Sequence, residues 1–255
     1  MLSIVIVSYN ARQDLERCLE SLQSPPPTIA HETIVVDNDS TDGSADAARR
    51  WTGVRVIQNR PNVGFAAANN VGIRASQGRY LLLLNSDTVV PEGAIDKLVA
   101  VIEAQPDVAV VGPRLVDGKG RAELSFGRMI TPINEIRQKR LAQSGAVEQL
   151  TQQRHYPDWV SGACLLVRRE DAEAVGLLDE RFFMYTEDVD FCAAIRARGG
   201  KILFEPTIEI VHLRGRSANS ARAETDAAYR RSRIAFYEKH HPAWVPLLKL
   251  YMRLR

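Results

Sequence analysis

The chain has 255 residues, of which 45% are hydrophobic and 25% are charged, a composition typical of a globular protein and unlike that of a disordered or fibrous one. Its 33 Lys and Arg side chains nearly balance its 31 Asp and Glu side chains, so the net charge of +2 gives no reason to expect nucleic acid as a partner. The three cysteines form no Cys-x-x-Cys pair, which argues against a disulfide framework or a zinc knuckle.

The same features bear on location. The first residues lack the basic leader and long apolar region of a signal peptide, and no apolar run reaches the roughly 18 residues needed to cross a bilayer. An odd number of cysteines suits a reducing compartment. We therefore expect a cytoplasmic protein that is either soluble or attached peripherally to the inner face of the membrane.

Residues 1–112 alternate short β-rich apolar runs with amphipathic helical patterns, as in the βα units of a mostly parallel sheet. The expected strands are Ile4–Val7, Thr33–Val36, Val54–Gln58, Tyr80–Leu84 and Val108–Val111. The expected helices are one capped by Asn10, one over Ser44–Trp51, one over about 64–75 and one that begins at Pro91. Because the run Tyr80–Leu84 is apolar throughout, it should be a central strand covered on both faces.

The pattern changes after Gly112. Residues 128–157 are rich in Arg, Lys and Gln and weakly periodic, which indicates substrate-facing loops with one helix near Ile133–Gln143. Regular structure resumes with an expected strand over Trp159–Val167, a helix over Glu187–Arg198, and two further strands near Ile202–Phe204 and Ile208–Val211. No linker or internal repeat interrupts the chain, so one compact two-lobed domain is expected.

The C-terminal part is basic. Residues 207–255 hold ten Arg and Lys against four Asp and Glu. A solvated basic helix is the simplest explanation, and an anionic membrane face or a phosphorylated substrate is the alternative. The segment Trp244–Leu248 could rest on a membrane surface or pack on the core.

Polar residues follow four of the expected strands at their carboxyl ends, where open α/β sheets bind ligands. These are Ser8-Tyr9-Asn10, Asp37-Asn38-Asp39, Asn62-Val63-Gly64 and Asn85-Ser86-Asp87. Asx turns, helix caps and turn punctuation could account for most of them. Asp87 is harder to explain by packing, because a carboxylate that closes an apolar central strand is well placed to hold a hard divalent cation against phosphate oxygens.

A second acidic group, Glu187, Asp188 and Asp190, lies at the start of an expected helix. These acids could simply complement the helix dipole, with Thr186 as the cap. The apolar run Phe182–Tyr185 before them favours another interpretation, because a carboxylate beside such a run has a raised pKa suited to proton abstraction. Neighbouring helix positions point about 100° apart, so one of Glu187 and Asp188 should face the reaction, and we favour Asp188.

His212 follows the apolar strand Ile208–Val211. A histidine at a strand end is often structural, but a neutral imidazole is also a good ligand for Mn²⁺ and similar ions. Arg214 and Arg216 beside it could neutralise a diphosphate.

Seven segments in one order carry a resemblance to a known family. They are Ser3–Asn10, Val35–Ser44, Asn62–Gly72, Leu83–Asp87, Gly162–Cys164, Phe183–Asp190 and His212–Ser217. With them the chain resembles the family 2 glycosyltransferases of the GT-A fold over about residues 2–240, and in particular their bacterial rhamnosyltransferase-like branch.

The resemblance implies an α/β fold of the GT-A, Rossmann-like type, with a mostly parallel central sheet flanked by helices and a smaller acceptor-side lobe. Residues 1–112 would be the nucleotide-sugar-binding half, about 113–221 the acceptor and catalytic half, and about 222–255 a basic helical tail. The implied activity is an inverting, metal-dependent transfer of a sugar from a nucleotide diphosphate donor. Rhamnose from dTDP-rhamnose is the preferred donor, a hydroxyl of a cell-envelope polysaccharide or lipid-linked glycan the preferred acceptor, and a UDP-hexose the alternative donor.

The resemblance also implies roles for single residues. Asp188, with Glu187 beside it, would take the acceptor proton, and Asp87 and His212 would hold Mn²⁺ or Mg²⁺ on the diphosphate. The implied acceptor residues are Trp159, Gly162 and Tyr185. The implied donor-binding residues are Ser8, Tyr9, Asp37, Asp39, Asn62, Gly64, Asn69, Asn85, Ser86 and Arg216.

The sequence departs from the family in one motif. The usual Asp-x-Asp is Asn85-Ser86-Asp87, which removes one charge, so metal binding would be weaker or would depend more on His212. The Gln-x-x-Arg-Trp motif of processive synthases is absent, which favours a single-addition enzyme. A nucleotidyltransferase or dehydrogenase is disfavoured because Ser8–Arg12 contains no glycine, whereas a non-catalytic sugar-nucleotide-binding module stays an alternative.

Overall fold

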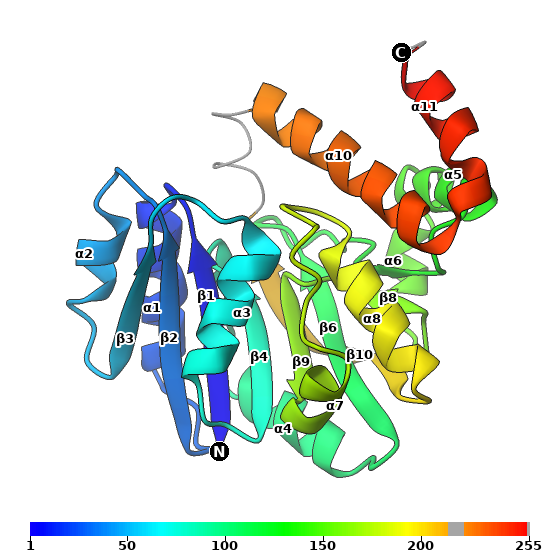
Figure 1. The fold of residues 1–255 in the computed structure, drawn as a ribbon. Helices are drawn as coiled ribbons and strands as arrows, with labels where there is room; N and C mark the ends of the chain where they lie inside the picture. Colours follow the sequence, from blue (N-terminus) through cyan, green and yellow to red (C-terminus); the bar gives the residue numbers. More distant parts are fainter. Residues whose placement is uncertain (214–221, 254–255) are drawn as a thin grey trace.

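The computed structural model describes residues 1–213 and 222–253, and an eight-stranded sheet forms its centre (Figure 1). The strand order is β3-β2-β1-β4-β9-β6-β10-β5. The strands are β1 (Leu2–Ser8), β2 (His31–Asn38), β3 (Val54–Asn59), β4 (Tyr80–Asn85), β5 (Thr88–Val89), β6 (Val108–Val116), β9 (Cys164–Arg168) and β10 (Lys201–His212). Only β9 and β5 pair antiparallel with their neighbours among these strands, so the predicted mostly parallel α/β sheet is confirmed.

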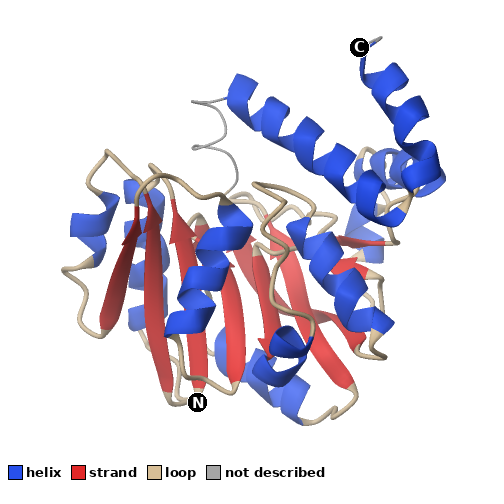
Figure 2. Cartoon of the chain, in the orientation of Figure 1, coloured by secondary structure: helices blue, strands red, loops and turns tan. Residues whose placement is uncertain are grey.

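Helices cover both faces of the sheet (Figure 2). On one face lie α1 (Arg12–Gln23) and α4 (Ala94–Glu103), and on the other lie α3 (Phe65–Ala75), α7 (Arg169–Ala174) and α8 (Glu187–Ala197). Along β4, Leu82 and Leu84 pack with the first group while Leu81 and Leu83 pack with the second, because successive side chains of a strand point to opposite faces. This explains why the run that forms β4 contains no polar residue before Asn85.

The remaining elements lie beside the sheet or along its edges. They are α2 (Ser44–Ala48), β7 (Phe126–Gly127), α5 (Pro132–Ala142), α6 (Val147–Leu150), β8 (Trp159–Val160), α10 (Arg222–His240), the short 3₁₀ helix η1 (Pro242–Trp244) and α11 (Val245–Arg253). A small second sheet pairs β7 with β8. Within the described residues, no helix is both long and apolar enough to cross a membrane.

Several predicted elements differ in the structure. The single strand expected over Trp159–Val167 is divided into β8 and β9, because residues 161–163 leave the sheet; there the Asn85 N–H donates to the Ala163 carbonyl. The two strands expected after Ile202 form one long strand, β10. Its register against β6 shifts between Glu205 and Glu209, where Pro206 has no N–H to donate.

The expected cap of the first helix was also wrong. Asn10 Oδ1 accepts a hydrogen bond from the Thr41 N–H, and the Arg12 N–H at the start of α1 donates to Asp42 instead. The basic tail is not one helix but α10 and α11, separated at Pro242. Elements with little periodicity of their own, such as α6, α7, β5 and β7, escaped prediction.

Helix α10 is packed onto the rest of the molecule. Phe236 and Tyr237 of α10 form a buried cluster with Phe182, Val189 and Leu248. The expectation that the segment Trp244–Leu248 packs on the core is confirmed for Leu248, which is buried, whereas Trp244 and Leu247 are exposed.

The contact between α3 and β1 depends on Gly72. A Cβ atom there would lie 2.4 Å from Val5 Cγ1, so Gly72→Ala should destabilise the fold by about 1–3 kcal/mol through overpacking. Urea denaturation measures the change. Gly145→Ala is the matched control, because a Cβ at Gly145 meets no atom within 4 Å. Equal unfolding midpoints for the two variants would contradict the predicted close packing.

Candidate active site

Three predicted donor-binding residues meet at the carboxyl ends of adjacent parallel strands. Ser8 is in register with Asp37 across β1 and β2, and Asn85 is in register with Val7 across β4 and β1. Because parallel strands end at the same edge of a sheet, the strand order alone brings these residues together although they are far apart in sequence.

Each of these three residues has a buried oxygen with no hydrogen-bond partner among the described residues: Ser8 Oγ, Asp37 Oδ1 and Asn85 Oδ1. The other carboxylate oxygen of Asp37, Oδ2, accepts hydrogen bonds from the Ser40 N–H at 3.3 Å and from Gln58 Nε2 at 3.4 Å. Buried polar atoms in folded proteins are nearly always partnered. A row of unpartnered oxygens at one sheet edge is therefore suited to the polar groups of a ligand.

Other predicted donor residues make contacts within the protein. Asn62 Oδ1 accepts from Asn38 Nδ2 at 2.8 Å and from the Gly64 N–H at 2.9 Å, which shapes the loop after β3. Asn69 donates to the Phe65 carbonyl at 3.0 Å, inside α3. Asn62 and Asn69 therefore fix the conformation of the loop after β3 and of the first turn of α3.

The remaining donor predictions lie on the same loops or outside the described structure. Tyr9 is 43% exposed beyond β1, Asp39 has φ 72° in the turn after β2, and Ser86 is buried after β4. Arg216, like Arg214, lies outside the described residues.

Gly64 brings the loop after β3 against the loop before α8. Its φ is +88°, and a Cβ there would lie 2.5 Å from the Phe183 carbonyl oxygen. The next residue, Phe65, donates its N–H to that same oxygen at 2.6 Å. A side chain at position 64 would therefore separate two loops that the backbone holds together.

The acidic pair lies where that second loop enters α8. Tyr185 and Thr186 have φ of 72° and 66°, a left-handed conformation that non-glycine residues rarely adopt. Asp188 is half-buried; its Oδ2 accepts from the Gly162 N–H at 2.9 Å and its Oδ1 from the Val189 N–H at 2.8 Å. Thr186 does not cap the helix with its side chain, contrary to the simpler expectation for this motif.

Burial raises the pKa of both acids. For Asp188 the hydrogen bonds from Gly162 and Val189 oppose the effect of burial, and the pKa is still raised. For Glu187, which is buried, the nearby charge of Asp188 adds to burial and raises its pKa well above the ordinary value. Glu187 Oε2 has no hydrogen-bond partner among the described residues. The pair therefore retains protons at pH values where exposed carboxyls have lost them.

The third acid of the motif has a different position. Buried Asp190 accepts from Lys239 Nζ at 2.8 Å and contacts His240 Nε2 at 2.6 Å, both on α10. The sequence grouped Asp190 with Glu187 and Asp188, but the structure uses it to hold the C-terminal helix.

Asp87 and His212 are brought together by the pairing of β5 with β10. His212 is in register with Thr88, and its Nε2 lies 3.3 Å from Asp87 Oδ1. On the other side of the ring, Nδ1 lies 3.1 Å from Glu123 Oε2. Burial alone would lower the pKa of His212, but the hydrogen bonds to Asp87 and Glu123 raise it to about 9.

This arrangement suits a divalent cation. Asp87 offers a carboxylate oxygen, and the His212 ring offers a nitrogen once it has lost the proton that the two carboxylates hold on it; both are good ligands for Mn²⁺. The described part of the chain contains no cluster of three or more potential metal-ligating side chains, so a cation held by this pair would need further ligands from outside the described side chains. Glu123 escaped prediction because it belongs to no motif and is 89 residues from His212.

The predicted acceptor residues lie around the acidic pair. Gly162 contacts Asp188, and a Cβ at Gly162 would lie 3.3 Å from Asp188 Cβ. The Tyr185 ring meets the Tyr229 ring of α10 edge-on at 5.7 Å. Trp159 lies farther along β8 and donates its Nε1–H to the Arg128 carbonyl at 3.0 Å.

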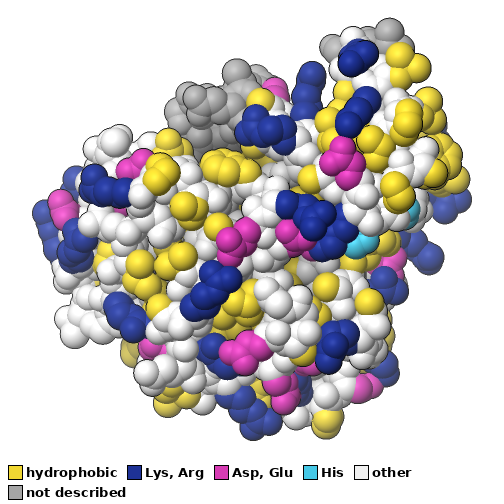
Figure 3. All heavy atoms as spheres, viewed as in Figure 1, with side chains coloured by type: hydrophobic (Ala, Val, Ile, Leu, Met, Phe, Trp, Pro, Cys, Tyr) yellow, Lys and Arg dark blue, Asp and Glu magenta, His cyan; other side chains and the backbone are white. Residues whose placement is uncertain are grey.

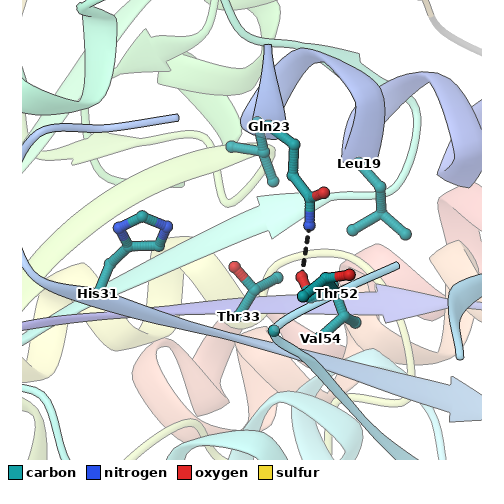
Figure 4. A pocket seen from close by; sticks show the side chains of 8 residues that line it. Leu19, Gln23, His31, Thr33, Thr52 and Val54 are labelled. Carbon is teal, nitrogen blue, oxygen red and sulfur yellow. Dashed lines mark hydrogen bonds between the residues drawn. The ribbon is translucent and has the colours of Figure 1, made fainter. Parts of the chain in front are cut away.

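A separate pocket opens near the amino ends of β2 and β3 (Figure 4). Its lining includes His31, Thr33 and Val54, and Gln23 at the end of α1 donates to the Thr52 carbonyl at 2.8 Å. None of the predicted site residues lines it. The candidate active site is therefore the carboxyl edge of the sheet.

Comparison with known proteins finds a matching family. Residues 3–175 match the model of a family described as Glycosyl transferase family 2. An N-acetylglucosaminyl-diphospho-decaprenol L-rhamnosyltransferase of Mycobacterium tuberculosis is 30% identical over 96% of this chain and 86% of its own length. A low-salt glycan biosynthesis hexosyltransferase of Haloferax volcanii is 26% identical over 83% of this chain and 66% of its own.

Solved structures share the fold at lower identity. A mannosyltransferase from Pyrobaculum calidifontis in complex with GDP-Man and Mn²⁺ has a TM-score of 0.65 at 19% identity, covering 97% of this chain and 68% of that one. GalNAc-T7 with UDP, GalNAc and Mn²⁺ has a TM-score of 0.64 at 21% identity, covering 84% of this chain and 44% of that one. This chain thus spans less than half of the GalNAc-T7 chain. The likeness confirms the expected GT-A fold.

Burying Glu187 lowers the stability of the folded chain by an amount that can be measured. The unfolded chain loses this proton near the ordinary pKa of 4.5, whereas the folded chain holds it to higher pH, so stability falls as the pH rises above that value. Glu187→Gln should therefore raise the melting temperature at pH 8 by about 2–4 °C, the shift that 1 kcal/mol produces in a chain of this size.

Calorimetric melting at pH 8 and pH 5 measures this difference, and the gain should shrink at the lower pH. The exposed Glu20→Gln is the matched control and should show no such pH dependence. A Glu187→Gln variant that melts lower than the wild type at pH 8 would contradict the raised pKa of this buried acid.

Proposed function

Since the chain belongs to glycosyl transferase family 2, we propose that it transfers one sugar from a nucleoside diphosphate donor to an acceptor hydroxyl with inversion at the anomeric carbon. The main support is the geometry of one sheet edge. Unpartnered oxygens of Ser8, Asp37 and Asn85 lie there, and the same edge ends at the Asp87–His212 pair.

In this proposal the nucleotide lies across the ends of β1, β2 and β4. Asp37 Oδ1 accepts a hydrogen bond from a ring N–H of the pyrimidine base, and Asn85 and Ser86 lie near the ribose. The preferred donor is dTDP-rhamnose; the name of the mycobacterial relative, an L-rhamnosyltransferase, supports the sugar. A UDP-hexose is the second candidate, supported by the UDP in the GalNAc-T7 structure.

Asp87 and His212 are the residues that would hold a divalent cation, Mn²⁺ or Mg²⁺. When bound, such a cation would neutralise the negative charge that develops on the diphosphate leaving group. Glu123 orients the ring: by accepting at Nδ1 it directs Nε2 towards Asp87. Both solved neighbours have Mn²⁺ in their names, which supports the cation.

Asp188 is the proposed general base. The acceptor oxygen forms a bond to the anomeric carbon while the bond from that carbon to the diphosphate oxygen breaks, and the hydroxyl proton passes to the Asp188 carboxylate. The N–H groups of Gly162 and Val189 fix the carboxylate, and burial keeps it basic enough to take the proton.

The proposed acceptor is a lipid-linked glycan or polysaccharide of the cell envelope, approached from the side of Gly162, Tyr185 and Trp159. The name of the mycobacterial relative, which contains diphospho-decaprenol, supports a lipid-linked acceptor.

A thermal-shift panel tests the donor and the cation together. We expect dTDP-rhamnose to raise the melting temperature more than UDP, GDP or their sugars, and more with Mn²⁺ than without it. A ligand present at a hundred times its Kd stabilises the native state by about 2.7 kcal/mol. No shift with any nucleotide would refute the proposed function.

Variants in the same assay separate the cation site from the nucleotide site. His212→Ala and Glu123→Ala should weaken the Mn²⁺-dependent part about 10–100-fold while leaving nucleotide binding without Mn²⁺ intact. His31→Ala, at the opposite edge of the sheet, is the control. If Glu123→Ala binds Mn²⁺ as the wild type does, the orienting role of Glu123 is wrong.

Asp188→Asn should lower kcat about 10²–10⁴-fold with donor affinity unchanged, because it removes only the proton acceptor. A base acts when deprotonated, so the wild-type rate should fall as the pH drops through a pKa above that of an ordinary aspartate. Asp46→Asn is the control, because Asp46 is the exposed residue of α2. A wild-type protein that binds donors but never turns over would favour a non-catalytic binding module instead.

A further inference from the structure

Large apolar side chains are exposed on α5, η1 and α11. Ile133 and Ile136 of α5 are 65% and 56% exposed, and Leu247 and Leu250 of α11 are 56% and 54% exposed. Trp244 and Tyr251 are also exposed. We call these six residues the α5–α11 surface. Single exposed apolar residues are ordinary, but six large ones on neighbouring elements indicate an interaction surface.

The two helices are fixed to one another through Arg233 of α10. Its guanidinium donates two hydrogen bonds of 2.6 Å to the Glu135 carboxylate of α5, and it lies 5.8 Å from the centre of the Tyr251 ring of α11. Tyr237 of α10 also donates to Glu135, at 2.8 Å. The α5–α11 surface therefore belongs to the packed structure.

Helix α11 is apolar on two sides. Leu248 is buried against α10, with Val245 and Met252 packed beside it. Leu247 and Leu250 point away from that contact and are exposed. Packing of α11 on α10 accounts for the first set but not the second, so the outward residues need another partner.

The charges around the α5–α11 surface are mostly positive, and the exposed acid Glu238 of α10 is paired with Lys249 of α11 at 3.0 Å. Arg137, Lys139 and Arg140 are exposed on α5, and Arg253 is exposed on α11. Helix α11 contains no acidic residue, and the single acid of α5, Glu135, is bound by Arg233. Figure 3 shows hydrophobic atoms on the lobe formed by α10 and α11, with Lys and Arg and an acidic side chain among them.

The α5–α11 surface lies near the candidate active site. Figure 1 shows α10 and α11 projecting beyond the edge of the sheet at which the site lies. Helix α10 also holds the loop before α8, because Ser232 Oγ donates to the Met184 carbonyl at 2.7 Å. The α5–α11 surface therefore lies beyond the same end of the sheet as the candidate active site, next to the helix that holds the loop before Asp188.

We propose that the α5–α11 surface docks on an anionic lipid bilayer. Its leucine, isoleucine and aromatic side chains enter the boundary between headgroups and acyl chains, and the Arg and Lys side chains contact lipid phosphates. The benefit of this contact rests on the proposed function, in which the acceptor is lipid-linked. A second copy of the chain is a poorer partner, because a self-complementary interface would place like charges of the two copies together.

Vesicle flotation tests the docking. The wild type should float with vesicles of phosphatidylcholine and phosphatidylglycerol and much less with phosphatidylcholine alone. L247E/L250E should reduce partitioning about tenfold or more, because it puts two charges where apolar side chains enter the bilayer. K139E/R140E should reduce partitioning about tenfold on the anionic vesicles alone.

The matched control is R50E/K97E, which reverses two exposed charges on the far part of the molecule. All variants alter exposed residues, so their melting temperatures should equal that of the wild type. A wild type that floats with neither vesicle, or an L247E/L250E variant that floats as well as the wild type, would overturn the docking. A dimer in sedimentation velocity that L247E/L250E converts to monomer, without flotation of the wild type, would assign the surface to self-association.

The thermal-shift panel separates this inference from the proposed function. If vesicles fail to bind while dTDP-rhamnose still raises the melting temperature, the docking is wrong and the donor assignment stands. If vesicles bind and no nucleotide shifts the melting temperature, the docking holds and the donor assignment falls.

Discussion

The buried carboxylate of Asp190 ties the candidate active site to the C-terminal helix. Burying an unpaired charge is costly, and Asp190 avoids that cost through Lys239 Nζ at 2.8 Å and His240 Nε2 at 2.6 Å. Because Asp190 lies one turn into α8, this contact fixes the start of that helix, where Glu187 and Asp188 lie. The left-handed backbone of Tyr185 and Thr186 costs conformational energy, and contacts that hold the neighbouring residues offset this cost.

The two halves of the site are joined by hydrogen bonds from backbone N–H groups. Phe65, at the start of α3, donates its N–H to the Phe183 carbonyl, and Gly162, between β8 and β9, donates to Asp188. The first contact links the loop after β3 to the acidic pair, and the second links the pair to the sheet. The separation between the proposed donor site and the proposed base is thus set by the scaffold, as positioning of reactants requires.

The sequence could predict the parts of the fold whose signal is local. Strands β1, β2, β3, β4 and β6 were predicted because each contains an apolar run, whereas the two-residue strand β5 was too short to show one. The meeting of Ser8, Asp37 and Asn85 follows from parallel strand order. The division of Trp159–Val167 into two strands could not be found, because hydrogen bonds with distant Asn85 and Asp188 cause it. The role of Asp190 depends on α10, about 50 residues later, and no local pattern announces such a partner.

The substitution of Asn85 for an acid can be weighed against the structure. The Asn85 backbone is fully used: its N–H donates to Ala163 and its carbonyl accepts from Thr88 Oγ1, so the residue holds the end of β4 in place with either side chain. What asparagine removes is one negative charge near Asp87. Glu123 supplies a negative charge on the far side of His212, where its contact with Nδ1 makes Nε2 more basic. In the proposed site the cation would therefore depend on the Glu123–His212 pair for the charge that the first acid of the motif usually provides.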